Sequence, residues 1–193
     1  DLHSFPTRRS SDLEIMSPNV FNTMRGYFNQ FGLGVKTGID IPGESTGLQG
    51  ASGYKHIGSA LDLSFGNYDA YTTMQVAQYM STIANGGNRI EPHVVQAIRG
   101  TSPDGKLGTV KATVMPKVLN HIDMTQAQRN VVTTGLYRVV HGTNTYKTGG
   151  MLDSIKPEIS AKTGTAQTFY NGNETVTLSL ASYAPSTHPQ VVV

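Results

Sequence analysis

The sequence predicts an α+β domain in which helices pack on an antiparallel sheet. Three segments carry apolar residues at helical spacing, and from residue 159 onward the pattern changes to the alternation typical of strands. Short turn signals separate these strands, which favours a meander of antiparallel strands over parallel βαβ units. The last strand, from residue 190, runs to the chain end, so the domain is expected to be incomplete.

The first predicted helix begins after Ser17, which can cap it, places Pro18 at the first helical position and ends at Gly32. Its apolar residues recur at helical spacing: Val20, Phe21, Met24, Phe28 and Phe31. Nine glycines lie between Gly32 and Gly66, counting both ends, so a long irregular segment follows. Such a loop can form the wall of a site.

Two further helices begin with the same pattern, a threonine followed three residues later by glutamine, which is typical of a capping box. One spans Thr72 to Ala84 and stops at Asn85-Gly86-Gly87; the other spans about Thr125 to His141 and stops at Gly142. The residues predicted to face the core are Val76, Ala77, Met80, Ile83 and Ala84 in the first and Val132, Leu136, Val139 and Val140 in the second. Between them, Arg89 to Arg99 reads as a short strand or extended pair, and residues 102–105 form a turn.

The C-terminal region predicts a hairpin. Ile159 to Phe169 is the first strand, Asn171-Gly172-Asn173 is the turn, and Thr175 to Tyr183 is the second strand. Val176, Leu178 and Leu180 alternate with polar residues, so they are expected to form a buried face. Pro185 and Pro189 bracket another turn before the strand at Gln190 to Val193.

Composition excludes several classes of function. The net charge is +2, from 15 basic and 13 acidic residues without runs, so neither nucleic acid nor an anionic membrane is an expected partner. Cysteine is absent, and the six histidines show no paired spacing, so neither a metal site nor a cofactor is expected. No apolar run approaches the ~20 residues that span a bilayer. Residues 1–13 resemble translated sequencing adapter and are set apart from residues 14–193.

The tripeptide Lys-Thr-Gly occurs three times, at residues 36–38, 147–149 and 162–164. The first copy lies in the glycine-rich loop, and the second runs into Gly149-Gly150, which disfavours a strand. The third copy lies on a predicted strand that leads into a hairpin. Context therefore selects the third copy as the candidate site.

The chemistry of this strand suits a carboxylate ligand. Lys162 supplies a positive charge, Thr163 and Thr165 supply hydroxyl donors, and Gly164 lets a ligand approach the backbone. A backbone N–H on the same edge can also face an oxyanion. On spacing alone, an ordinary edge strand with a surface lysine and β-favouring threonines remains the simpler interpretation.

Motifs along the chain, from about Asn19 to Val193, resemble the class B penicillin-binding proteins, most of all the Gram-positive type that serves septal or peripheral wall synthesis. They keep the family's order: Phe31-Gly32-Leu33-Gly34, residues 37–44 (Thr-Gly-Ile-Asp-Ile-Pro-Gly-Glu), Ser64-Phe65-Gly66-Asn67, residues 72–77, residues 84–87, His141-Gly142-Thr143, residues 162–166 and Ser182-Tyr183-Ala184-Pro185.

The resemblance implies the fold of penicillin-binding transpeptidases and serine β-lactamases, and a peptidoglycan D,D-transpeptidase that β-lactams acylate. It implies that Lys162, Thr163 and Thr165 hold the substrate carboxylate, that the Thr165 N–H forms half of an oxyanion hole, and that Gly66 and Gly142 are framework glycines. The implied partners are stem peptides, β-lactams and, through the parent, division or elongation proteins. The implied location is the outer face of the cell membrane, through an anchor outside this chain.

Two of the family's motifs lack a convincing counterpart. Ser52-Gly53-Tyr54-Lys55 matches Ser-x-x-Lys by spacing but lies mid-loop and follows the candidate Ser-x-Asn. Ser17-Pro18-Asn19 matches Ser-x-Asn but lies too close to Gly32, and a helix cap explains it. We therefore expect the nucleophile to lie outside this chain and the fragment alone to be inactive. His141, at a helix C-terminus, is interpreted as a dipole contact without a catalytic role.

Two alternatives remain. A β-lactamase or β-lactam-sensing domain shares the fold and the strand motif, although neither typically carries the Gly-Ile-Asp-Ile-Pro-Gly-Glu loop of residues 38–44. A cell-wall or partner-binding module without catalysis would use the same strand for pairing with another protein.

Overall fold

The structure of the chain, a computed structural model, describes residue 17 and residues 19–143 and 147–193. The adapter-like residues 1–13 lie outside this range. The helices and strands in chain order are α2 (Asn19–Gln30), η1 (Tyr54–His56), α3 (Ser59–Ser64), α4 (Thr73–Ala84), β1 (Asn88–Ile90), β2 (Ala97–Thr101), β3 (Leu107–Thr113), β4 (Val118–His121), α5 (Gln126–His141), η2 (Gly150–Leu152), β5 (Ser160–Tyr170), β6 (Asn173–Ala184) and β7 (Val191–Val192).

The C-terminal strands form the predicted antiparallel meander, in the order β5-β6-β7. Asn171 (φ 50°) and Gly172 (φ 77°) form the turn between β5 and β6 in the left-handed region, where asparagine and glycine are favoured. The third strand is shorter than the segment predicted for it, but Val193 extends the pairing through two backbone hydrogen bonds with Ser182. The mixed α+β architecture predicted from the sequence is confirmed.

Helices α4 and α5 begin as their capping boxes predict. The side chains of Thr72 and Thr125 accept from the backbone N–H of Gln75 and Gln128, whose own side chains accept in return from the threonine N–H. In the structure α4 packs on β6 and α5 on β5. The residues that form this core are Met80, Ile83 and Ala84 of α4, Leu136 of α5 and Tyr183 of β6. The prediction that Val132 also faces the core is wrong, because its side chain is exposed on α5.

A second core lies between α2 and α3, where Phe21, Ala60 and Leu63 are buried together. Helix α2 forms within the predicted segment, and the backbone N–H of Asn19 donates to the Ser17 hydroxyl at its start. Pro18, predicted at the first helical position, lies outside the described residues. The segment predicted as irregular from Gly32 to Gly66 contains the short helix α3 and the single turn η1. Ala60 and Leu63 give α3 an apolar side that packs on α2, which a count of glycines could not indicate.

A buried ion pair joins α2 to the loop after α3. Arg25 Nε donates to Asp69 Oδ2 at 2.8 Å and Arg25 Nη2 donates to Asp69 Oδ1 at 2.7 Å, so the pair is bidentate. The same guanidinium donates to the Gly50 carbonyl and to the Ser52 hydroxyl. Burial alone would raise the pKa of Asp69, but the hydrogen bonds from Arg25 and from the Gly50 N–H lower it.

The carboxylates of the Gly-Ile-Asp-Ile-Pro-Gly-Glu loop are used to hold the fold. Glu44 accepts from the backbone N–H and the hydroxyl of Thr37, so the loop closes on itself. Asp40 accepts from the N–H groups of Val94 and Val95, and the Val94 bond is the main cause of the lowered pKa of Asp40. These contacts give both acidic residues a structural explanation.

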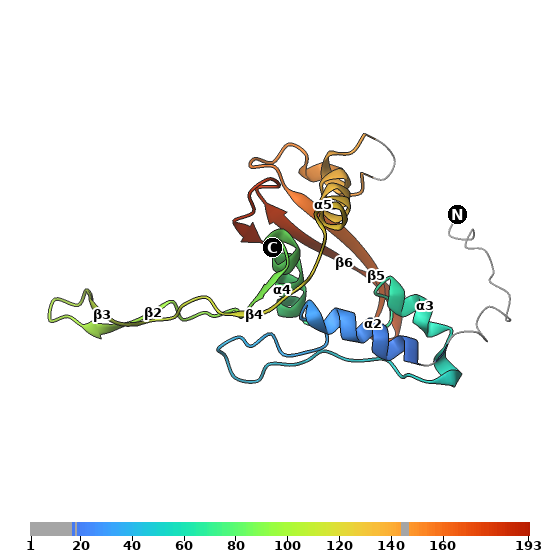
Figure 1. Cartoon of the computed structure of the whole chain (residues 1–193), viewed down its shortest axis with the longest axis horizontal. Coiled ribbons are helices and arrows are strands. Elements are labelled where there is room, and N and C mark those ends of the chain that lie inside the picture. Colours follow the sequence, from blue (N-terminus) through green and yellow to red (C-terminus); the bar gives the residue numbers. More distant parts are fainter. Residues whose placement is uncertain (1–16, 18, 144–146) are drawn as a thin grey trace.

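A two-stranded ribbon of β2 and β3 projects away from the rest of the molecule (Figure 1). Only the first part of this region was predicted as extended; β3 and β4 were not. Strand β4 pairs with β1 at the base of the ribbon. The side chains of β3 are largely exposed, so the strand lacks the alternation that marks a half-buried strand in a sequence.

The buried face predicted for β6 is also wrong. Val176, Leu178 and Leu180 are 56%, 77% and 42% exposed, although they alternate with polar residues as expected. Burial in this hairpin is confined to one end, where Ser160 and Ala161 of β5 lie beside Ser182 and Tyr183 of β6. Helices α4 and α5 pack on the hairpin, while residues 173–180 of β6 are exposed.

Candidate functional site

The candidate strand lies at the edge of its sheet. β5 pairs with β6 along its whole length, and no other strand of the described residues pairs with its second edge. Residues 162–165 follow directly after the buried start of the strand, so their backbone is held by the core while their side chains are accessible. The prediction that residues 159–169 are extended is confirmed from Ser160 onward.

The register separates the two hydroxyls from the lysine. Thr163 lies opposite Leu180, and Thr165 lies opposite Leu178, so both threonines share one face with the exposed apolar residues of β6. Lys162 lies opposite Ala181 on the other face. Its side chain curls along the strand, and Nζ donates to the Thr163 carbonyl at 2.5 Å. The lysine side chain and the two threonine hydroxyls therefore start from opposite faces of the strand.

Gly164 lies close to a side chain of β6. A Cβ atom at this position would lie 2.3 Å from the Ser179 hydroxyl oxygen, which is closer than any real Cβ contact. Because Gly164 shares its face with Lys162, the glycine makes room for a neighbouring side chain on that face. This contact explains Gly164 without reference to the ligand that the sequence suggested.

The two other Lys-Thr-Gly copies behave differently from each other. Thr37 is fully buried and bound to Glu44, so the first copy is part of the loop framework. The second copy, residues 147–149, forms no strand, as predicted, but it lies against β5: Thr148 Oγ1 is 2.8 Å from Thr163 Oγ1. Sequence reasoning missed this contact, and the repeated tripeptide itself was the one signal that could have drawn attention to it.

His141 makes more contacts than a helix-end histidine needs. Its Nδ1 lies 2.5 Å from Asp153 Oδ1, and its Nε2 lies 3.0 Å from the carbonyl oxygen of Ile159, the residue before β5. Lys147 also binds Asp153, and hydrogen bonds from Lys147 and His141 lower the pKa of that carboxyl. The interpretation of His141 as a dipole contact was therefore incomplete, because its ring links α5 to the start of β5.

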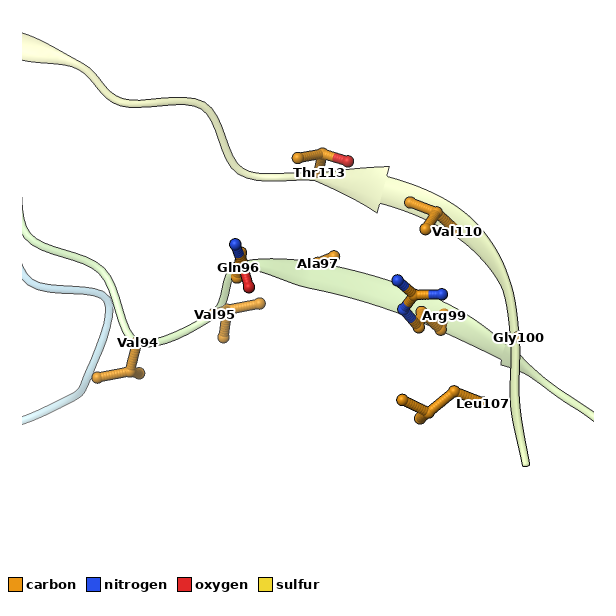
Figure 2. Close-up of a pocket in the computed structure, with 9 residues that line it drawn as sticks. All are labelled: Val94, Val95, Gln96, Ala97, Arg99, Gly100, Leu107, Val110 and Thr113. Atoms are coloured by element: carbon orange, nitrogen blue, oxygen red, sulfur yellow. The ribbon is translucent and has the colours of Figure 1, made fainter. Parts of the chain in front are cut away.

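Two hollows of the described surface lie away from β5. One, of about 690 Å³, lies along the ribbon and is lined by residues 94–97, Arg99, Gly100, Leu107, Val110 and Thr113 (Figure 2). The other lies between α5 and the turn after β6, beside Arg129 and Thr187. The candidate strand is thus an exposed edge in this chain and lines neither hollow. In the described ranges no helix has the length and apolarity to cross a bilayer.

The chain is similar to known proteins along most of its length. The family model of the penicillin binding protein transpeptidase domain matches residues 14–193. The chain is 42% identical to Penicillin-binding protein 2A of Bacillus subtilis over 186 residues, covering 92% of the chain and 25% of that protein. It is 37% identical to Penicillin-binding protein 2B of Streptococcus pneumoniae over 177 residues, covering 91% and 26%.

A solved structure agrees with these relatives. Penicillin-binding protein 2B from Streptococcus pneumoniae strain R6 superposes with a TM-score of 0.78 at 36% identity, covering 90% of this chain and 29% of that one. The chain spans about a quarter of the length of the curated relatives it matches. Family model, relatives and fold agree, and the chain belongs to the penicillin-binding protein transpeptidase family as a class B homologue.

Proposed function

We propose that residues 14–193 are the C-terminal part of the transpeptidase domain of a parent enzyme, a peptidoglycan D,D-transpeptidase, and that they supply its substrate-binding strand. The observation that carries this proposal is the edge position of β5, whose second edge pairs with no other described strand and whose residues include Lys162, Thr163 and Thr165. An extended peptide can add to such an edge through backbone hydrogen bonds. A carboxylate at the end of that peptide matches one cation and two hydroxyl donors.

In the proposed reaction a serine hydroxyl attacks the carbonyl of the penultimate D-Ala of a stem peptide, and the terminal D-Ala leaves as an amine. An amine from a neighbouring stem then attacks the acyl-serine, which restores the hydroxyl and forms the crosslink. Lys162, Thr163 and Thr165 hold the terminal carboxylate during the first step. The Thr165 N–H supplies half of an oxyanion hole, and one such donor is worth ~3 kcal/mol of transition-state stabilisation.

We infer that the serine nucleophile lies outside this chain. The one Ser-x-x-Lys in the sequence begins at Ser52, whose hydroxyl accepts a hydrogen bond from the buried Arg25 at 2.6 Å. Gly53 (φ 116°) follows it in a conformation that a helix cannot continue. This serine is held by a cation in a loop, where it lacks the helical spacing to its lysine that the chemistry uses.

The proposed partners are stem peptides and β-lactams, whose carboxylates suit the same strand. We place the parent enzyme at the outer face of the cell membrane, where peptidoglycan is crosslinked, with contacts to division or elongation proteins made through the parent. The Gly-Ile-Asp-Ile-Pro-Gly-Glu loop of residues 38–44, which a β-lactamase or sensor does not typically carry, favours this proposal over those alternatives.

The inactive-fragment part of the proposal is tested by mixing the purified chain with a fluorescent penicillin. We expect no covalent labelling after separation under denaturing conditions. Stoichiometric labelling would show that the chain has its own nucleophile, and mass spectrometry of the labelled peptide would identify it.

The role of the strand is tested in a chimera in which residues 14–193 replace the matching segment of Penicillin-binding protein 2A of Bacillus subtilis. Because a charge-assisted hydrogen bond contributes ~1.5–3 kcal/mol, Lys162→Ala should slow acylation by fluorescent penicillin about 10- to 100-fold. Lys111→Ala, on the ribbon, is the matched control and should leave the rate unchanged. Equal rates for both variants would favour a non-catalytic binding module instead.

A further inference from the structure

The second Lys-Thr-Gly copy is fixed against the candidate strand. Its Gly149 N–H donates to the Val139 carbonyl of α5 at 2.9 Å, and a Cβ at Gly149 would lie within 3.4 Å of both Val139 and Val140. This close approach places Thr148 over β5, where its hydroxyl oxygen is 2.8 Å from that of Thr163. The contact joins residues fifteen positions apart, so it depends on how the connecting segment is held.

The far end of the segment is held by His141 and Asp153. Lys147 and His141 both bind the Asp153 carboxylate, and the other ring nitrogen of His141 binds the carbonyl of Ile159, next to the first residue of β5. The His141 side chain is buried. Helix α5, residues 147–153 and the start of β5 therefore form one connected unit, and Thr148 has little freedom to leave Thr163.

The chemistry of hydroxyl groups indicates which of the two threonines donates the hydrogen bond. A threonine hydroxyl has one hydrogen to donate and two lone pairs that accept. If Thr163 donates its hydrogen to the substrate carboxylate, the Thr163 oxygen is free to accept the hydrogen of Thr148. The reverse arrangement, with Thr163 donating to Thr148, would leave the carboxylate facing lone pairs.

We propose that Thr148 is a positioning residue, which donates to the Thr163 hydroxyl and thereby turns the Thr163 hydrogen towards the substrate carboxylate. This proposal rests on the proposed function of β5. A chain of two hydroxyl bonds that ends on an anion strengthens each bond in it. Thr148 thus acts through Thr163 and touches neither the scissile carbonyl nor the nucleophile.

The test uses the same Bacillus subtilis chimera, with second-order acylation rates for a fluorescent penicillin and for its methyl ester, in which the carboxylate charge is masked. Because one neutral hydrogen bond is worth ~1 kcal/mol, Thr148→Val should slow acylation by the acid about fivefold and acylation by the ester less than about twofold. Thr148→Ser keeps the hydroxyl and should restore the rate with the acid. Thr113→Val, on the exposed ribbon, is the matched control.

A double-mutant cycle separates positioning from general damage. With Thr163 already changed to Val, adding Thr148→Val should cause no further loss, because the hydroxyl through which it acts is absent. Equal losses with acid and ester, or a full further loss in the Thr163→Val background, would overturn the proposal. If Lys162→Ala slows acylation and Thr148→Val does not, the positioning role fails while the proposed function stands; if neither slows it, the proposed function fails.

Discussion

The buried pair of Arg25 and Asp69 offers the sharpest test of how this chain is held together. Asp69→Asn keeps the size and shape of the side chain but removes its charge. The guanidinium would keep its neutral acceptors, the Gly50 carbonyl and the Ser52 hydroxyl. Of its two bonds to residue 69, of 2.8 and 2.7 Å, it would keep at most one, because asparagine has a single acceptor oxygen. A buried cation without its counter-charge is strongly unfavourable.

The expected loss can be worked from that geometry. The Asp69 side chain is fully buried and that of Arg25 is 10% exposed, so solvent offers the orphaned charge little compensation. Removing one partner of such a pair costs ~3–5 kcal/mol in the free energy of unfolding. For a chain of this length, each kcal/mol lowers Tm by about 2–4 °C, so a fall of roughly 10 °C is expected.

Chemical denaturation followed by circular dichroism measures this loss, with Asp123→Asn as the matched control. Asp123 is exposed, and it makes no ion pair within the described ranges, so its replacement should change the unfolding free energy by less than ~0.5 kcal/mol. If Asp69→Asn is no more destabilising than this control, the reasoning about the buried charge is refuted.

The same pair predicts a dependence on pH. The folded-state pKa of Asp69 lies below its ordinary value of 3.8, so the carboxylate contributes stability that is complete above that value. This contribution is lost as the pH falls through the folded-state pKa. Below about pH 4, therefore, the wild-type chain should lose stability more steeply than Asp69→Asn. Parallel acid unfolding curves for the two proteins would contradict the assignment.

Three further outcomes are expected. Gly164→Ala should destabilise the chain by ~1–3 kcal/mol, because its Cβ would overlap the Ser179 hydroxyl. Adding Ser179→Ala should recover most of that loss in denaturant titrations, and no recovery would mean that the strain arises at another contact. Gln78→Leu should lower the free energy of unfolding by ~1–3 kcal/mol or more, because the Gln78 amide donates to two backbone carbonyls, at 3.0 and 2.8 Å. An unchanged free energy in the same titration would mean that water takes the place of the amide. Burial, with the charge of Asp69, raises the pKa of Tyr71 to about 12. The difference in ultraviolet absorbance between wild type and Tyr71→Phe should therefore titrate near pH 12, and a midpoint near the ordinary value of 10.0 would contradict this assignment.

Local signals predicted the elements that depend on nearby residues. The capping boxes at Thr72 and Thr125 fix where α4 and α5 begin, and both partners of each box lie within three residues in the sequence. The turn at Asn171-Gly172 likewise sets the register of β5 and β6. The candidate strand could be predicted because it leads directly into this local turn.

Contacts between distant segments could not be predicted in this way. Arg25 meets Asp69 across 44 positions, and nothing in the local pattern around either residue indicates a partner. The contact of Thr148 with Thr163 depends on how residues 147–153 are held by His141 and Asp153. Alternation correctly placed Leu178 on one face of β6, but burial depends on what covers that face, which a strand's own sequence does not encode.

The ribbon of β2 and β3 has a consequence for how the molecule moves. Its two strands pair mainly with each other, its base is held by Asp40, and a Cβ added at Gly105 at its tip would meet nothing within 4 Å. Amide hydrogens along the ribbon should therefore exchange with solvent through local unfolding of the ribbon that leaves the helices and the main sheet intact. A dye, an epitope or a short peptide inserted near the tip would then report on the protein without disturbing the strand where substrate is proposed to bind.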